Sequence, residues 1–436
     1  MRESVLICAL AVACATLAAV LPGRAASQTF PAVESFPDPR DLRPSNSPPD
    51  PLVMLDGRRV QDRAMWEKER RPELKRLFQH YMYGYMPSRP PKLNARVVRE
   101  DRSYFGGRAT KREIDLQFGS SVTRPIHLLL VTPNGRAHPA PVFVCIAFCA
   151  PFAAVNDPTI PVPTGWMYPG APGIVNNRAT EAARGGQVDV WNIEQTIDRG
   201  YAVALYYNGD VEPDAPSSRE GVRWNLLRRG RKELDSLDWG AVAAWAWGAQ
   251  RVVDYLVKDP SVDRKRIAVV GHSRNGKAAI VAGAFDERIA LVIPLQAGCG
   301  GTAPSRGTVG ESVTRINTSF PHWFNANFKQ FNDRPEFLPF DQNALVALCA
   351  PRPVLFSNAE EDSWANPTGQ FEVLRAANAV YRLYGSGGIS ATSVPPVNTL
   401  IDSQLGYFIR PGKHSMTKVD WDAFLDFADR HFGKPK

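Results

Sequence analysis

Short apolar runs recur along the second half of the 436-residue chain, separated by longer stretches that mix apolar and polar residues. The runs that are nearly continuous in apolar residues span 141–148, 201–207, 267–270, 291–295 and 353–357. Strands with this composition belong to a sheet that is buried on both faces. The pattern therefore predicts a mostly parallel central sheet.

The segment between the second and third runs has helical periodicity. From about residue 237 to residue 257, apolar residues recur at steps of three and four: Trp239, Val242, Ala246, Ala249, Val253 and Leu256. Ser236 or Asp238 can cap the start of this helix, and Pro260 ends it. Strand, helix and strand in this order imply right-handed crossovers, so we expect a three-layer α/β sandwich with helices on both faces.

The chain before the first apolar run has a different pattern. Residues 27–60 are rich in Pro, Asp and Ser and predict an extended N-terminal arm. Residues 62–83 have apolar positions at helical spacing, and residues 92–135 carry two or three strand-like runs. We therefore expect the arm to be followed by a single α/β domain over residues 61–436.

The first residues have the pattern of an export signal. Arg2 supplies a positive charge, residues 6–21 are almost wholly apolar, and the small residues 25–27 follow. An apolar run of about 16 residues is shorter than the ~20 that span a bilayer, and small residues at its end are typical of signal cleavage. We expect residues 1–26 to be a signal peptide and the mature protein to be secreted or periplasmic.

Composition sets broad limits on function. The chain is 44% hydrophobic and 22% charged, which fits a globular protein with a large core. Its net charge is +8, and the basic residues are scattered, which does not indicate nucleic-acid binding. After the signal the cysteines are too few for a disulfide scaffold, so we expect core cysteines or a single bridge. They are Cys145, Cys149, Cys299 and Cys349.

The segment with the clearest chemistry begins as an apolar strand, runs into Gly271-His-Ser273-Arg274, and continues as a helix of small residues. A nucleophile elbow needs this arrangement, because its serine sits on a strained turn whose close neighbours must be small. The backbone N–H of Arg274 then serves as one oxyanion donor at a helix N-terminus. The alternative is that Ser273 only caps the helix, and the downstream acid and histidine favour a nucleophile.

A serine nucleophile of this kind is followed along the chain by its acid and then its base. His414, in a Gly-containing loop after the last predicted strand, is the expected base. His322 is its rival, but its aromatic neighbours suggest a pocket wall. After the strand at 353–357, Asp362 is the expected acid and Glu361 the second choice. The acid would hold the histidine tautomer and stabilise the imidazolium.

An ordered set of segments resembles the glucuronoyl esterases of carbohydrate esterase family 15, and the bacterial branch fits best. The similarity covers most of residues 60–432. The matching segments are 271–277, 298–301, 321–324, 338–342, 350–353 and 362–365. The resemblance implies an α/β-hydrolase fold and hydrolysis of the ester between 4-O-methyl-glucuronic acid of glucuronoxylan and lignin alcohols.

The resemblance also implies roles for individual side chains. The Arg274 side chain would help to stabilise the oxyanion, Lys277 and Glu311 would contact the sugar, and Trp364 would shape the pocket. Many members carry a catalytic glutamate where this chain has Gln296. Because Gln cannot supply a charge, either the acid comes from the 358–367 loop or the activity is low. On this basis, substitution of Gln296 by Glu should be tolerated.

The expected function is therefore a serine esterase that works through an acyl-enzyme, without a cofactor or a metal. The loop at 147–151 lacks the Asn, Gly and His of many members, which leaves the second oxyanion donor open. Alternatives are another carbohydrate esterase, such as one for acetyl-xylan, and a weakly active or non-catalytic polysaccharide-binding relative. We expect a glucuronoxylan–lignin ester as the partner, no nucleic acid, no membrane after signal cleavage, and a monomer.

Overall fold

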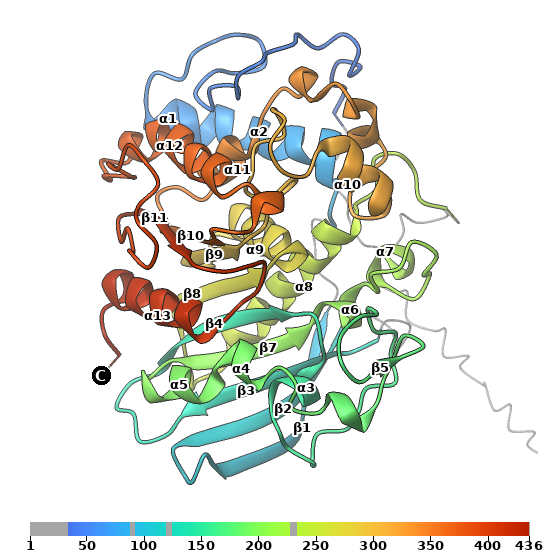
Figure 1. Cartoon of the computed structure of the whole chain (residues 1–436), viewed down its shortest axis with the longest axis vertical. Helices are drawn as coiled ribbons and strands as arrows, with labels where there is room; N and C mark the ends of the chain where they lie inside the picture. Colours follow the sequence, from blue (N-terminus) through green and yellow to red (C-terminus); the bar gives the residue numbers. More distant parts are fainter. Residues whose placement is uncertain (1–33, 88–91, 119–123, 227–232, 436) are drawn as a thin grey trace, which may run out of the picture.

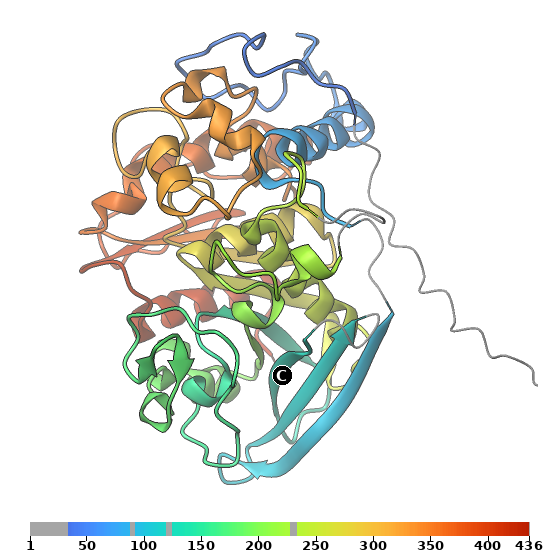
Figure 2. The same cartoon turned by 90° about the vertical axis from the view of Figure 1, so that its right-hand side faces the viewer.

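The computed structural model describes residues 34–87, 92–118, 124–226 and 233–435, and its centre is a sheet of nine strands (Figure 1). The strands follow one another across the sheet in the order β1-β2-β3-β7-β4-β8-β9-β10-β11. Antiparallel pairing joins β1 (Leu93–Tyr104), β2 (Ala109–Phe118) and β3 (Ile126–Pro133), and β3 pairs antiparallel with β7. In Figure 2 these three strands run along the lower right of the molecule.

The other six strands are parallel to one another. They are β4 (Ala140–Ala147), β7 (Ala202–Tyr207), β8 (Val262–His272), β9 (Leu291–Leu295), β10 (Val354–Ala359) and β11 (Leu405–Arg410). Each apolar run that predicted a strand overlaps with one of them and extends at most one residue beyond its ends, so the mostly parallel sheet is confirmed.

Alternate residues of β4 point to opposite faces of the sheet and fill two apolar cores. Val142, Val144 and Ile146 belong to one core, and Phe143 and Cys145 belong to the other. Helices α8 (Ala241–Leu256), α9 (Arg274–Phe285), α11 (Gln342–Ala347) and α12 (Pro367–Leu383) pack in the first core. Helices α3 (Pro151–Ala154), α4 (Val188–Trp191), α5 (Ile193–Asp198) and α13 (Lys418–Phe432) pack in the second. The expected three-layer arrangement is confirmed.

Helix α8 begins at Ala241 with Gly240 as its N-cap, so the predicted caps Ser236 and Asp238 are wrong. The first N–H groups of the helix donate to backbone carbonyls from a distant segment: Ala241 to His322 and Val242 to Trp323. A Cβ at position 240 would lie 2.1 Å from the carbonyl oxygen of Trp323. A tertiary contact therefore replaces the side-chain cap.

The segment over residues 62–83 is helical, as predicted. It consists of α1 (Arg63–Met65), the π-helical turn η1 (Trp66–Arg70), α2 (Arg71–Phe78) and the π-helical turn η2 (Gln79–Tyr83). Residues 34–60 run over this end of the molecule as loop and turns (blue in Figure 1). They bury apolar side chains of their own in the first core: Leu42, Leu52, Met54 and Val60.

The remaining elements are short and lie in the loops between those above. The strands β5 (Ile174–Val175) and β6 (Arg178–Ala179) form a separate hairpin. The helical elements are η3 (Glu181–Ala183), α6 (Asn208–Val211), α7 (Val222–Asn225), α10 (Val313–Ser319), η4 (Asn327–Phe331), η5 (Pro335–Phe337) and η6 (Ser363–Ala365).

Cys145, Cys149, Cys299 and Cys349 are all free and buried. Of the two alternatives for the cysteines, core packing is therefore the one found, and the single bridge is not formed. Within the described residues, no helix has the length and apolar character needed to cross a membrane. The expected signal peptide at 1–26 lies outside the described residues.

Candidate active site

Ser273 lies on the sharp turn between β8 and α9, at φ 58° and ψ −122°. This backbone conformation is strained for a residue with a side chain. The turn depends on two glycines: a Cβ on Gly271 would lie 2.1 Å from the carbonyl oxygen of Asn275, and a Cβ on Gly276 would lie 2.9 Å from that of Leu295. The N–H of Ser273 donates to the same Leu295 carbonyl at 2.9 Å. The chain thus has the strand–turn–helix geometry that a nucleophile elbow requires.

His414 and Asp362 meet at the carboxyl edge of the sheet, in the loops that follow β11 and β10. Nδ1 of His414 lies 2.6 Å from Oδ2 of Asp362, whose side chain is 2% exposed, whereas the histidine is 38% exposed. Because the carboxylate accepts a hydrogen bond from Nδ1–H, Nε2 of His414 carries no proton and is free to act as a base. Glu361 is exposed, and its backbone N–H donates to the carbonyl of Gly412. The structure pairs the first-choice acid, and not the second, with His414.

His272, the residue before Ser273, brings the base and the elbow together. Its ring centroid lies 4.5 Å from that of His414. Burial and the nearby charge of His414 lower the pKa of His272 to about 3. His272 is therefore neutral at ordinary pH and serves as a packing surface for His414.

The Arg274 side chain lies in a box of aromatic rings beside the elbow. Its guanidinium carbon is 4.1 Å from the ring centroid of Tyr168, 4.9 Å from Trp323, 5.3 Å from Phe320 and 5.7 Å from Phe148. Phe148 belongs to the unusual loop at 147–151, so this loop contributes a wall of the box. Rings at these distances attract a cation through their faces and restrict its movement.

A buried carboxylate, Asp214, neutralises Arg274. Asp214 forms an ion pair with the guanidinium and accepts hydrogen bonds from Nε2 of His322 and Nε1 of Trp323, each at 2.8 Å. Burial raises the pKa of Asp214, but the His322 hydrogen bond, the Arg274 charge and the Trp323 hydrogen bond outweigh it and leave the pKa below its ordinary value. His322, the rival base, is thus tied to Asp214. The sequence did not single out Asp214, which follows Glu212-Pro213 in a loop without a recognisable motif.

Lys277 and Glu311 lie close enough to interact electrostatically. Lys277 is buried, and its Nζ donates to the carbonyl of Ala297 at 2.5 Å. Burial lowers the pKa of Lys277, and burial raises the pKa of Glu311 against the opposing charge of Lys277. Trp364 is half exposed, and its carbonyl accepts the N–H of Glu311 at 3.0 Å. The four residues whose roles the resemblance implied, Arg274 included, therefore surround one region.

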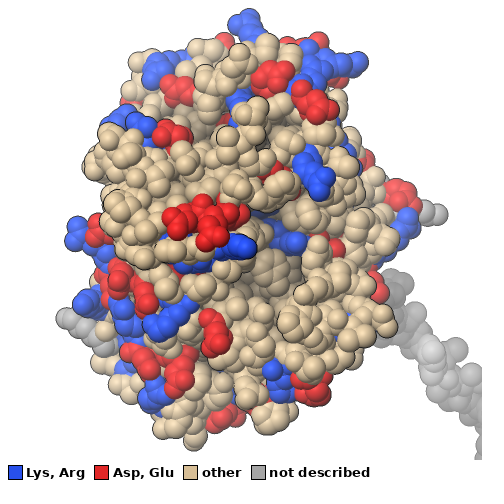
Figure 3. Space-filling model, viewed as in Figure 1, with Lys and Arg blue, Asp and Glu red and all other residues tan. Residues whose placement is uncertain are grey.

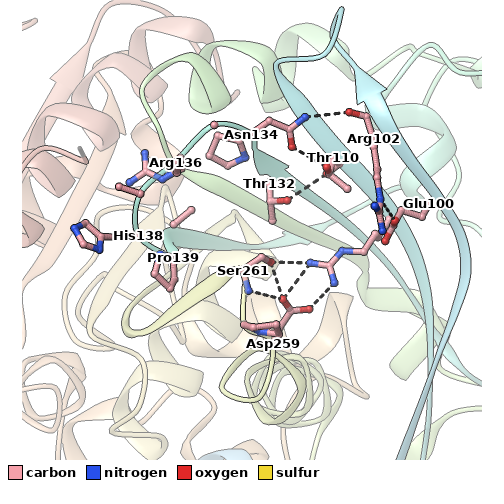
Figure 4. A pocket seen from close by; sticks show the side chains of 16 residues that line it. Glu100, Arg102, Thr110, Thr132, Asn134, Arg136, His138, Pro139, Asp259 and Ser261 are labelled. Atoms are coloured by element: carbon pink, nitrogen blue, oxygen red, sulfur yellow. Dashed lines mark hydrogen bonds and ion pairs between the residues drawn. The ribbon is translucent and has the colours of Figure 1, made fainter.

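On the face seen in Figure 1, acidic and basic side chains gather beside a hollow near the centre of the molecule (Figure 3). The loop between β11 and α13, which carries His414, crosses this part of the face. A separate cavity of about 540 Å³ has Ala140 and Ser261 in its lining, at the amino ends of β4 and β8 (Figure 4). Since β8 runs from that cavity to His272, roughly 30 Å separates it from the elbow.

Four charged residues of that separate cavity are paired with each other. Arg112 donates to both carboxylate oxygens of Asp259, at 2.7 and 3.1 Å, and Arg102 pairs with Glu100 (Figure 4). Ser261 donates its hydroxyl to Asp259 at 2.6 Å, and among the described residues no hydrogen bond joins His138 of this cavity to either of them (Figure 4). The elbow therefore remains the candidate site.

Comparisons with known proteins show that the chain is similar to carbohydrate esterases. A family model described as glucuronyl esterase of fungi matches residues 181–385. A carbohydrate esterase from an unknown prokaryotic organism is 42% identical over 390 residues, which cover 89% of this chain and 90% of that protein.

Two solved structures superpose on about nine-tenths of this chain. A glucuronoyl esterase from Solibacter usitatus superposes with a TM-score of 0.84 at 38% identity, covering 90% of this chain and all of that one (100%). A promiscuous esterase of carbohydrate esterase family 15 from a marine bacterial metagenome superposes with a TM-score of 0.83 at 41% identity, covering 90% and 99%.

Proposed function

The chain belongs to carbohydrate esterase family 15, and from this premise we propose that it hydrolyses esters of (4-O-methyl-)glucuronic acid on glucuronoxylan with lignin alcohols. Ser273 is the nucleophile, His414 the base and Asp362 the acid that orients it. The observation that carries the proposal is the 2.6 Å contact between His414 and Asp362 beside the strained turn at Ser273.

The reaction starts with Oγ of Ser273 attacking the carbonyl carbon of the ester while Nε2 of His414 takes the hydroxyl proton. The tetrahedral intermediate then breaks its bond to the lignin-side oxygen, and His414 gives its proton to the departing alcohol. His414 then takes a proton from water as its oxygen attacks the carbonyl carbon of the glucuronoyl-enzyme. The bond from that carbon to Oγ of Ser273 breaks, His414 returns the proton to Oγ, and the sugar acid leaves. Asp362 stays ionised and stabilises the imidazolium in both steps.

The developing oxyanion is stabilised by groups that are already in place when the substrate arrives. The backbone N–H of Arg274 and the N-terminus of α9 point their positive ends at the turn. The Arg274 guanidinium is held by Asp214 and the aromatic rings, so it acts as a positioned hydrogen-bond donor whose charge is largely balanced. Fixed donors of this kind cost no reorganisation during the reaction.

Lys277 and Glu311 recognise the sugar hydroxyls of the acyl group. A buried cation and a partly buried carboxylate offer a donor and an acceptor that a simple acetyl group cannot use. Two enzymes of the same family are named 4-O-methyl-glucuronoyl methylesterases, from Wolfiporia cocos and Phanerochaete chrysosporium. These names and the charged pair together favour a glucuronoyl ester over an acetyl ester.

The place of action follows from the substrate. A xylan–lignin polymer does not enter a cell, which fits the export signal expected at residues 1–26. The proposal therefore places the enzyme outside the cell or in the periplasm. We also expect it to be a monomer. N-terminal sequencing of the exported protein tests the cleavage, and a mass of about two chains in light scattering would contradict the monomer.

The activity is tested by comparing three substrates: a benzyl ester of glucuronic acid, acetylated xylan and p-nitrophenyl acetate. The proposal predicts the highest kcat/KM for the glucuronate ester. A preference for acetylated xylan would instead make the protein an acetyl esterase. Failure to hydrolyse any of them would make it a non-catalytic relative.

A further inference from the structure

Gln296 follows β9 directly and lies in an unusual backbone conformation, at φ 48°. Its side chain is buried, with 1% of the residue exposed, and its backbone N–H donates to the carbonyl of Ser357 on β10 at 2.9 Å. A non-glycine residue at positive φ persists only where its surroundings hold it there. The backbone of Gln296 is therefore fixed, and its buried side chain is held in one orientation.

The side-chain amide of Gln296 contacts the backbone of Ser415, the residue after the base His414. Oε1 of Gln296 accepts the N–H of Ser415 at 2.9 Å, and Nε2 of Gln296 donates to the carbonyl of Ser415 at 3.0 Å. A backbone N–H can only donate and a carbonyl can only accept, so the two contacts fix which end of the amide is oxygen. One buried amide thus holds both polar groups of the residue that follows His414.

The same amide also holds the ring that packs against the base. Nε2 of His272 lies 3.0 Å from Oε1 of Gln296. Because Oε1 only accepts, His272 must donate from Nε2, and its tautomer is fixed. The ring of His272 in turn lies 4.5 Å from that of His414, at an interplanar angle of 37°. Gln296 therefore reaches His414 by two routes, through the backbone of Ser415 and through the ring of His272.

We propose that Gln296 is a positioning residue for the general base, and that it works because its side chain is a neutral amide with both a donor and an acceptor. The proposal rests on the function proposed above for Ser273 and His414. In this proposal Gln296 does not stand for a lost catalytic glutamate; it orients His414 through hydrogen bonds. A misplacement of about 1 Å in a catalytic group can cost about 100-fold in rate.

Two features explain why a carboxylate is a poor substitute at this position. A carboxylate has no N–H to offer the carbonyl of Ser415, and two oxygens would face one another there. Its charge would also favour protonation of His272, which would place a cation against the ring of His414. The contacts therefore predict that Gln296→Glu is damaging, although the sequence alone suggested tolerance.

The charged and titratable groups around the amide decide how pH acts on such a variant. They are His272 on β8, Arg274 at the start of α9, Arg410 at the end of β11 and His414 in the loop that follows. Arg410 is paired with the buried Asp420 of α13 at 2.7 Å, and Asp362 reaches the amide only through His414. Arg410 itself donates to the carbonyl of Ser415 at 2.6 Å. Once protonated, the carboxyl group of the Gln296→Glu variant could replace the lost donor, so the rate of the variant should approach that of the wild type as the pH falls.

The experiment compares wild type, Gln296→Glu, Gln404→Glu, Asp362→Asn and the double variant Gln296→Glu with Asp362→Asn. Gln404 is the matched control, because it precedes β11 at the opposite edge of the sheet, and its Nε2 donates to the carbonyl of Pro351. Rates are measured from pH 5 to pH 9 on the glucuronate ester and on p-nitrophenyl acetate, with melting curves for each protein. Hydrolysis of p-nitrophenyl acetate depends on Ser273 and His414 but not on recognition of a sugar. A wrong substrate assignment would therefore appear as poor hydrolysis of the glucuronate ester by the wild type, whereas a wrong role for Gln296 would appear as an unchanged rate of the Gln296→Glu variant on the acetate.

We expect Gln296→Glu to lower kcat about 100-fold at pH 8 on both substrates with KM nearly unchanged. The ratio of wild-type to variant rates should shrink as the pH falls, and the double variant should be no faster than Asp362→Asn alone. Three results would overturn the proposal: a Gln296→Glu rate within twofold of wild type, a rate ratio that is the same at every pH, or a gain in the rate of Asp362→Asn when the second substitution is added.

Discussion

Asp214 and Arg274 form a buried ion pair beside the nucleophile, and the same carboxylate accepts hydrogen bonds from His322 and Trp323. Residues 322 and 323 also cap α8 through their backbone carbonyls. Residues 322–323 thus connect the start of α8 with Asp214 and, through it, with the Arg274 side chain at the elbow. This connection holds the Arg274 guanidinium in one place.

We expect Asp214→Asn to lower both activity and stability. Arg274, whose side chain is 13% exposed, would lose its buried counter-ion, and breaking one partner of a buried pair costs at most about 3–5 kcal/mol of folding stability. The rate should fall because the guanidinium is no longer fixed. Chemical denaturation and kcat on p-nitrophenyl acetate measure the two effects, with Asp402→Asn as the exposed control. Wild-type values for both quantities would refute the role given to Asp214.

The choice between the two neighbouring carboxylates can be tested directly. Asp362→Asn should lower kcat by about 10³–10⁴-fold, because a neutral amide can leave His414 in the wrong tautomer and cannot stabilise its cation. Glu361→Gln should stay within a factor of two, since that side chain is exposed. Rate measurements on the two variants suffice, and a reversed order of effects would show that the acid is Glu361.

Lys277 and Glu311 should affect one substrate far more than the other. Lys277→Met keeps the buried stem and removes the charge, and Glu311→Gln keeps the shape. Both should lower kcat/KM on the glucuronate ester by about 10–100-fold, the cost of one or two lost hydrogen bonds to a charged group. Hydrolysis of p-nitrophenyl acetate should change little. Equal losses on both substrates would indicate a structural role for the pair.

A fourth prediction concerns the dependence of stability on pH. Burial raises the pKa of Glu212 from an ordinary 4.5 to about 7, so the folded state binds a proton that the unfolded state has released. The stability contributed by this group is present below pH 4.5 and is lost as the pH rises to 7. Glu212→Gln should remove this loss, which amounts to at most about 3 kcal/mol. Denaturation at pH 4.5 and pH 7 measures it, and an unchanged pH slope in the variant would contradict it.

The elbow and the parallel strands could be predicted from the sequence because they depend on neighbouring residues. Gly271, Ser273 and Gly276 lie within one turn of chain, and the steric demand that links them is local. Parallel strands bring their carboxyl ends to one edge of the sheet, so the loops after β10 and β11 lie beside each other, in the order acid then base that this type of fold uses. For this reason Asp362 and His414 could also be chosen from the sequence alone.

The parts that could not be predicted depend on contacts between distant segments. Asp214 lies 60 residues before Arg274 in sequence, and no local pattern marks it as a partner. The start of α8 at Ala241 is set by backbone carbonyls some 80 residues downstream, which accept the hydrogen bonds of its first N–H groups in place of a side-chain cap. Gln296 bonds to Ser415, which lies 119 residues later in the sequence. The sequence alone could therefore show only that position 296 lacks the carboxylate that many members of the family carry.

The central claim is that Ser273 attacks the ester of a glucuronic acid, and replacement of this serine tests it most directly. We would measure hydrolysis of the benzyl glucuronate ester by wild type, Ser273→Ala and Ser403→Ala, together with their circular dichroism spectra. Ser403 is the matched control, since it lies before β11 at the other edge of the sheet. The account predicts a loss of at least about 1,000-fold for Ser273→Ala alone, with an unchanged spectrum. A Ser273→Ala enzyme that keeps wild-type turnover would contradict it.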